Sequence, residues 1–181
     1  MFSRLSGLGL LAVLVAIAPL AIPAPAHPQT QTQTQTQTQT QDERDVIAVA
    51  QKFFDAMAAC DATSARAITM PDGRLYRLAD GAAPAVISST FAEITGSLAK
   101  CGRKMLERIW EPQVRVHKGI ATLWAPYDFW LDGAFRHCGI DSFELVKGPD
   151  GWKITGGTYT VEREGCAPSP LGPPAPTGPA R

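Results

Sequence analysis

The sequence predicts an α+β domain: N-terminal helices packed on a curved antiparallel sheet, in a cone-shaped α+β barrel. Apolar residues recur at helical spacing from Val46 to Met57. Four β-rich runs joined by short turn sequences follow between Lys104 and Glu162. Because the helical segments come first and the strands later, the pattern favours α+β over alternating α/β.

Three helices are expected before the sheet. Asp42, Glu43 and Asp45 stand where carboxylates favour a helix N-terminus, and the first helix should end near Cys60. Asp61 is a suitable N-cap for a short second helix. The apolar spacing over residues 85–100 predicts a third.

The segment 70–81 holds two Asp-Gly pairs and predicts a short strand or small hairpin. The later strands are expected over residues 104–117, 120–131, 134–146 and 152–162. Their connections, Lys118-Gly119, Asp132-Gly133 and residues 147–151, are short enough for an antiparallel meander.

The first 26 residues have the features of a secretory signal peptide. Arg4 is followed by an apolar run too short to span a bilayer comfortably, and Ala24-Pro25-Ala26 is a small-residue cleavage site. The expected location is periplasmic or secreted, with no membrane association after cleavage. An uncleaved membrane anchor is the alternative.

Low-complexity segments flank the expected domain over residues 42–166. Residues 27–41 are mainly a Gln/Thr repeat without the apolar side chains that would offset ordering entropy, and we expect them to be disordered. Residues 167–181 are rich in Pro and Gly and predict a disordered tail.

The domain contains four cysteines, Cys60, Cys101, Cys138 and Cys166. In an oxidising compartment they allow two disulfides in three connectivities. Cys60 with Cys101 is the favoured pair because both stand at predicted helix ends, and buried free thiols are the alternative. The spacings match no zinc pattern.

The Asp132-Gly133 turn sets a register for the strands on either side. Counting back from it places Trp130 opposite Phe135 and Asp128 opposite His137. Directly opposed residues share a face, with Cβ atoms about 5 Å apart. Asp128 and His137 should therefore meet on the inner face. Pro126 predicts a bulge, so the pattern does not determine which face the residues before Pro126 take.

Alternation along residues 134–146 places Asp141 and Phe143 on the same inner face as His137. Tyr127, Arg136 and Glu144 are expected on the outer face. The candidate ligand-binding residues are Trp130, Phe135, Phe143, Phe54 and Met57, although aromatic residues in such positions more often form plain core than a ligand cage.

The acid and the imidazole could orient a bound ligand, act in catalysis in either of two ways, or have only a structural role. The carboxylate of Asp128 could fix the tautomer of His137 and leave the other ring nitrogen as a base. Asp141 could itself be the base. A polar pair that only satisfies its own hydrogen bonds and fixes the strand register is the structural interpretation.

Composition argues against several classes of function. Lys plus Arg and Asp plus Glu are both 17, so the chain has no basic excess to attract nucleic acid. It has no Gly-rich phosphate loop in a strand–helix context, and we expect no cofactor. Three histidines, one of them before the domain, are too few for a His-rich metal site.

The segment HCGIDSFELVKGPDGWKI, residues 137–154, resembles the closing hairpin of the nuclear transport factor 2-like superfamily. The order of helices and strands is similar over most of residues 46–162. Members include ketosteroid isomerase, scytalone dehydratase, SnoaL-like cyclases, limonene epoxide hydrolase and inert pockets. The resemblance implies a cavity between sheet and helices, and a homodimer through the outer sheet face.

These observations together predict an exported domain that binds a small hydrophobic or aromatic molecule. One alternative is a proton-transfer enzyme (isomerase, dehydratase or cyclase) using His137 with Asp128 or Asp141. The other is a protein–protein interaction module that uses the outer sheet face.

Overall fold

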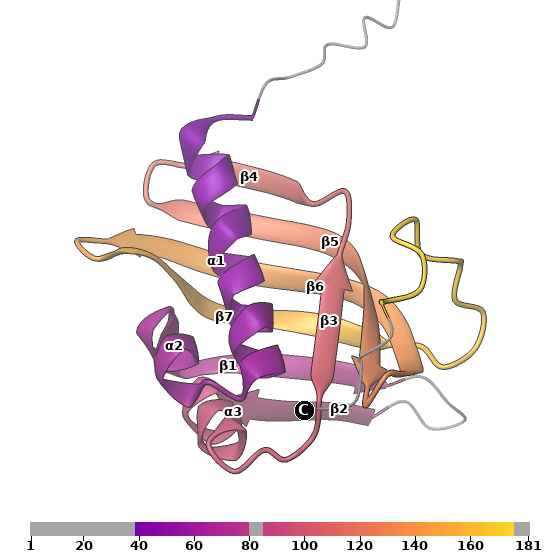
Figure 1. The fold of residues 1–181 in the computed structure, drawn as a ribbon. Coiled ribbons are helices and arrows are strands. Elements are labelled where there is room, and N and C mark those ends of the chain that lie inside the picture. Colours follow the sequence, from indigo (N-terminus) through magenta and orange to yellow (C-terminus); the bar gives the residue numbers. More distant parts are fainter. Residues whose placement is uncertain (1–38, 80–84, 176–181) are drawn as a thin grey trace, which may run out of the picture. The chain divides into compact units, whose positions relative to one another are not determined.

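The structure is a computed structural model that describes residues 39–79 and 85–175 (Figure 1). The predicted signal peptide and most of the Gln/Thr repeat lie outside these residues. The described parts contain three helices and seven strands: α1 Gln41–Ala59, α2 Ala62–Ala67, β1 Thr69–Ala79, β2 Ala85–Thr90, α3 Phe91–Leu98, β3 Met105–Ile109, β4 Gln113–His117, β5 Ile120–Leu131, β6 Ala134–Gly148 and β7 Gly151–Val161.

The first two helices begin and end at residues with capping chemistry. Thr40 and Glu43 form a capping box at the start of α1, and Cys60 ends the helix in the left-handed conformation. The side chain of Asp61 accepts hydrogen bonds from the backbone of Thr63 and Ser64, which confirms it as the N-cap of α2.

The strands form one curved, unclosed sheet in the order β2-β1-β7-β6-β5-β3, with β4 also paired to β5. The α+β class is therefore confirmed. The sheet is mixed, however, because β1 runs parallel to β7, whereas a wholly antiparallel sheet was expected. The helix α1 lies across one face (Figure 1), which we call the inner face.

The predicted third helix is wrong in its first half. Residues Ala85–Thr90 form strand β2, which pairs with β1, and only Phe91–Leu98 are helical. Val86 and Ile87 are β-branched and pair readily on an edge strand. Thr90 then caps α3 through a capping box with Glu93.

The segment around Asp72-Gly73 is not a turn. It lies inside the long strand β1, where the pairing with β7 shifts between Thr69 and Arg74. A Cβ at Gly73 would collide with the backbone of Thr155, so the close approach of the two strands requires glycine there.

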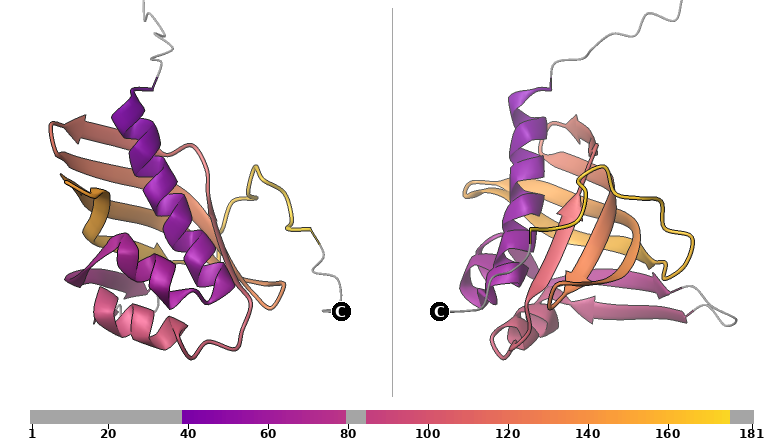
Figure 2. Two further views of the ribbon diagram at one scale, coloured as in Figure 1. Left: turned by 60° about the vertical axis from the view of Figure 1, so that its left-hand side comes forward. Right: turned by 45° about the vertical axis from the view of Figure 1, so that its right-hand side comes forward.

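The expected strand over residues 104–117 is divided in two. Trp110, Glu111 and Pro112 separate β3 from β4, and both strands pair with β5 along the same edge. Pro112 has no N–H to donate and Glu111 has a positive φ of 46°, so the ladder breaks here. As Figure 2 shows, the strand ends near β3 bend strongly.

The predicted Asp132-Gly133 turn is confirmed. Both residues have positive φ, 54° and 80°, as a type I′ hairpin requires.

Aromatic side chains from α1, α3 and the sheet form the core on the inner face. The ring of Phe53 packs edge-on against those of Phe54, Phe91 and Phe143. Aliphatic residues such as Leu123 complete this core.

Both disulfides are formed, Cys60–Cys101 and Cys138–Cys166. The first is the predicted pair. The second ties the strand β6 to the segment that follows β7. Among the described residues, no helix combines the length and the apolar character needed to cross a membrane.

Candidate functional site

The register of the β5–β6 hairpin decides which side chains meet. Trp130 pairs with Phe135 as predicted, but His137 pairs with Phe129, and Asp128 pairs with Cys138. The predicted Asp128–His137 pair is therefore wrong. Arg136 is the cause, because it is an extra residue on β6 that shifts the pairing by one position. The bulge expected at Pro126 is absent, since Pro126 stays in register with Ile140.

This bulge reverses the predicted faces of β5 relative to His137, and it also places Trp130 and Phe135, both expected inside, on the outer face. Tyr127 and Phe129 face inward, where both rings pack against that of His137. Asp128 and Trp124 point to the outer face, and Trp124 is 50% exposed. Tyr127, expected outside, is 1% exposed.

Between the sheet and the helices is a cavity of about 290 Å³, which we call the inner cavity. Its wall combines apolar side chains with a small polar group: Phe53, Met57, Leu75, Arg77, Ile94, Met105, Glu107, Phe129, His137, Asp141, Phe143 and Tyr159. Apolar walls with a few convergent polar groups are typical of small-molecule sites.

Two acidic side chains face each other in this cavity. Asp141 is 2% exposed, and burial raises its pKa to about 7. Glu107 is half-buried as a residue, and burial of its carboxyl group, together with the neighbouring Asp141, raises the pKa of Glu107 well above its ordinary value. The two carboxyl groups are near enough that the charge of one opposes ionisation of the other, so the pair tends to retain a proton. Asp141 Oδ2 has no hydrogen-bond partner within the described residues.

His137 is held by a chain of polar contacts. The Tyr127 hydroxyl donates to the Thr160 carbonyl at 2.6 Å and lies 3.1 Å from His137 Nδ1. Phe129 stacks on the imidazole at 4.9 Å between ring centroids. Burial, with a smaller contribution from Arg163, lowers the pKa of His137. The imidazole is thus favoured in its neutral form.

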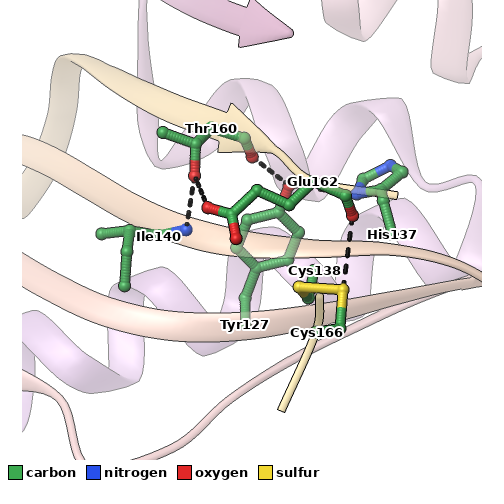
Figure 3. Close-up of a disulfide and its surroundings, with 7 residues drawn as sticks. All are labelled: Tyr127, His137, Cys138, Ile140, Thr160, Glu162 and Cys166. Carbon is green, nitrogen blue, oxygen red and sulfur yellow. Dashed lines mark hydrogen bonds between the residues drawn. A yellow bond between two sulfur atoms is a disulfide. The ribbon is translucent and has the colours of Figure 1, made fainter. Parts of the chain in front are cut away.

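The residues behind this chain lie at the second disulfide (Figure 3). The Thr160 hydroxyl accepts from the Ile140 amide and donates to Glu162, so this hydroxyl joins β6 and β7. Gly139 lies beside Thr160, and a Cβ there would collide with the Thr160 carbonyl. The glycine therefore allows the carbonyl to take the position in which it accepts from Tyr127.

Asp128 belongs to a different site. It forms a two-point ion pair with Arg108, at 2.9 and 2.5 Å, and is 2% exposed. Arg108 also donates to the carbonyl of Gly172 at 2.8 Å and lies over the Trp130 ring. Residues 167–173 therefore lie against the outer face here, whereas the sequence predicted a disordered tail from Ala167; residues 176–181 lie outside the described part.

The structure divides the predicted site residues between three places. His137, Asp141, Phe143 and Met57 line the inner cavity. Phe54 is buried in the core against Phe143. A groove on the outer face, beside the C-terminal segment, is lined by the remaining three: Asp128, Trp130 and Phe135.

Sequence reasoning missed Glu107, Arg77 and Tyr127. In β3 one face carries Met105, Glu107 and Ile109 and the other carries Leu106 and Arg108, followed by Trp110 just after the strand. Neither set is clearly more apolar. Periodicity alone could not choose between them. A charged residue within a short apolar strand was the only available signal for Glu107. Over residues 39–79 and 85–175, no cluster of three or more His, Cys, Asp or Glu side chains could hold a metal ion.

Helices on the inner face of a curved sheet, with a cavity between them, define the nuclear transport factor 2-like fold, also described as cystatin-like. No protein-family model matches the chain, and no curated protein matches it either. Solved structures do match.

A Nostoc punctiforme protein of unknown function with a cystatin-like fold has a TM-score of 0.55 at 12% identity, covering 70% of this chain and 95% of that one. A nuclear transport factor 2-like protein from Salmonella enterica has a TM-score of 0.54 at 14% identity, with 70% and 94% covered. A candidate dehydratase of the nuclear transport factor 2-like family from Streptomyces avermitilis has a TM-score of 0.52 at 16% identity, covering 66% of this chain and 95% of that one. At these identities the likeness establishes the fold alone.

Proposed function

We propose that the protein binds a small, mainly apolar molecule in the inner cavity. The observation that carries this proposal is an apolar cavity containing a buried carboxylate oxygen, Asp141 Oδ2, that no described residue contacts by a hydrogen bond. A volume of about 290 Å³ is at the small end for ligand sites, which span about 300–1,000 Å³. The ligand should therefore have one or two rings.

Thermal unfolding with a panel of one- and two-ring compounds tests this proposal. A ligand present at about 100 times its Kd stabilises the native state by about 2.7 kcal/mol, which should raise Tm by several degrees. Ile94→Trp fills the cavity from α3 and should abolish the shift. Ile120→Trp makes the same change at an exposed position on the outer face of β5 and should keep the shift. Equal shifts in both variants would locate binding elsewhere.

Proton transfer, as in an isomerase, dehydratase or cyclase, is the second candidate function. The observation that favours it is the pairing of one weak acid with one neutral base in the same cavity. The Glu107–Asp141 pair holds a proton near neutral pH, and His137 is neutral. Such a pair could protonate a leaving hydroxyl while the imidazole accepts a proton from the adjacent carbon. Asp128, on the outer face, is not part of this candidate.

Water elimination from ring β-hydroxy ketones, followed by absorbance of the conjugated product, tests the catalytic candidate. His137→Gln should lower the rate by about 10²–10⁴-fold with little change in binding. His117→Gln, at the end of β4, is the matched control and should keep the rate. Turnover that survives His137→Gln would exclude the imidazole as the base.

We also infer that the chain is exported to the periplasm or the outside of the cell. The sequence features of residues 1–26 and the two disulfides support this inference, because disulfides persist in oxidising compartments.

A further inference from the structure

We infer that the inner cavity selects a neutral ring compound bearing a hydroxyl group, of the phenol or alicyclic-alcohol class. This inference deepens the proposed binding function and rests on it. Three polar atoms of the cavity carry the argument: Asp141 Oδ2, Arg77 Nε and His137 Nε2.

Asp141 supplies an acceptor. Its carboxyl group lies in the cavity wall together with that of Glu107. Asp141 Oδ2 is buried and contacts no donor among the described residues. A buried acceptor without a donor destabilises the empty cavity, so a ligand that donates a hydrogen bond to this oxygen gains affinity.

Arg77 supplies a donor on the same row of the sheet. It pairs with Tyr159 on β7, and Tyr159 pairs with Asp141 on β6. The backbones of Arg77 and Asp141 are therefore two strand spacings, about 10 Å, apart. Arg77 Nε is buried, and no acceptor reaches it within the described part of the chain.

A hydroxyl is the simple neutral group that satisfies both atoms, because its hydrogen can bond to the Asp141 carboxylate and its oxygen can accept from Arg77. A ligand carboxylate would be repelled by the Asp141–Glu107 pair, and an ammonium by Arg77. A hydrocarbon would leave both atoms unsatisfied. The opposite charges of the acid pair and of Arg77 thus give no net preference for an ion of either sign.

His137 supplies a second acceptor, because its tautomer is set by its neighbour. The only proton of the Tyr127 hydroxyl is donated to the Thr160 carbonyl. The contact of 3.1 Å between that hydroxyl and His137 Nδ1 must then have Nδ1–H as the donor. In the neutral ring this leaves Nε2 with a lone pair. Tyr127 is thus a positioning residue for the imidazole.

Four naphthalene probes of similar size test the ligand class by calorimetry on the full chain: 2-naphthol, 2-methylnaphthalene, 2-naphthoate and 2-naphthylmethylamine. We expect 2-naphthol to bind about 10- to 100-fold more tightly than 2-methylnaphthalene, because one hydrogen bond to a charged group is gained. The two ions should bind more weakly than 2-naphthol.

The outcomes separate the two proposals. Equal affinity for 2-naphthol and 2-methylnaphthalene would overturn the hydroxyl inference and leave the binding function standing. No binding of either probe would overturn both. Asp141→Leu should remove the preference for 2-naphthol, whereas Glu144→Leu, on the outer face of the same strand, should keep it.

The tautomer is measured without any ligand. Long-range ¹H–¹⁵N NMR should show His137 protonated at Nδ1, with His137→Gln assigning the signal. Tyr127→Phe removes the acceptor for this proton and should shift the population toward Nε2–H. Protonation at Nε2 in the unmodified protein would overturn this part of the inference.

Discussion

Asp141 and Glu107 illustrate how burial changes the chemistry of a single residue. On a solvated surface both would be ionised at neutral pH. In the inner cavity the cost of burying charge raises the pKa of Asp141 to about 7 and raises that of Glu107 well above its ordinary value. The pair therefore keeps a proton that the unfolded chain would release.

This retained proton makes stability depend on pH in a defined direction. Between about pH 4 and pH 7 the native state binds more protons than the unfolded state, so the free energy of unfolding should fall as pH rises. The slope from one proton is at most about 1.4 kcal/mol per pH unit. Asp141→Asn should flatten this slope in urea unfolding, whereas Glu144→Gln, on the exposed outer face, should leave it unchanged.

His137 acts in the opposite sense, because its pKa is lowered. The native state binds fewer protons there, so this residue lowers stability as pH falls below 6.5, its ordinary value. The comparison of unmodified protein with Asp141→Asn cancels this contribution. Identical slopes in the two proteins would show that Asp141 is ionised when folded.

At the scale of elements, the segment after β7 is fastened to the sheet at two points. The disulfide Cys138–Cys166 joins it to β6, and the Gly172 carbonyl accepts from Arg108, which is itself held by Asp128. Figures 1 and 2 show this segment in yellow beside the bent strand ends and away from α1.

Replacing both Cys138 and Cys166 by Ser should release this segment. We expect a loss of about 2–4 kcal/mol in the free energy of unfolding and rapid proteolysis after residue 166, because the unfolded chain regains loop entropy and one anchor is lost. The pair Cys60→Ser/Cys101→Ser should lower stability but leave the segment protected. Equal protection in both variants would mean that the Arg108 contact alone is sufficient.

At the scale of the whole molecule, the outer sheet face carries exposed apolar side chains. Tyr76, Leu78, Val86 and Trp124 are between 43% and 69% exposed, and with Ile140 they line a shallow groove. Contiguous apolar surface of this kind marks interaction sites. A second copy of the chain is the expected partner, since a two-fold interface needs only one self-complementary patch.

Sedimentation should show a dimer that Trp124→Asp converts to a monomer, because a charge would then be buried in the interface. Leu171→Asp introduces the same charge at a similarly exposed position in the C-terminal segment, away from the patch, and should keep the dimer. A monomer for the unmodified protein at micromolar concentration would exclude this interface.

Local signals predicted the elements that depend on local chemistry. The capping side chain of Asp61, the positive φ of Asp132-Gly133 and the periodicity of α1 are properties of a few adjacent residues. These local properties were enough to predict the helices and the turn without reference to the rest of the chain. The pair Cys60–Cys101 was predictable because both residues lie at helix ends.

Residues 85–90 show where such reasoning ends. Their apolar spacing suits a helix, but pairing with β1 gives backbone hydrogen bonds that the local pattern does not encode. The parallel pairing of β1 with β7 likewise joins segments far apart in the sequence.

The sequence by itself determined the α+β class, the tight hairpin and the inward direction of His137 and Asp141, because the last follows from their alternation with Phe143 and Leu145 along β6. Only the tertiary structure decided that Glu107, and not Asp128, shares the cavity. A single extra residue, Arg136, shifts every pairing beyond it by one position, and one position moves a side chain to the other face of a sheet. Where that residue bulges is set by strand curvature and packing, which no local pattern of residues specifies.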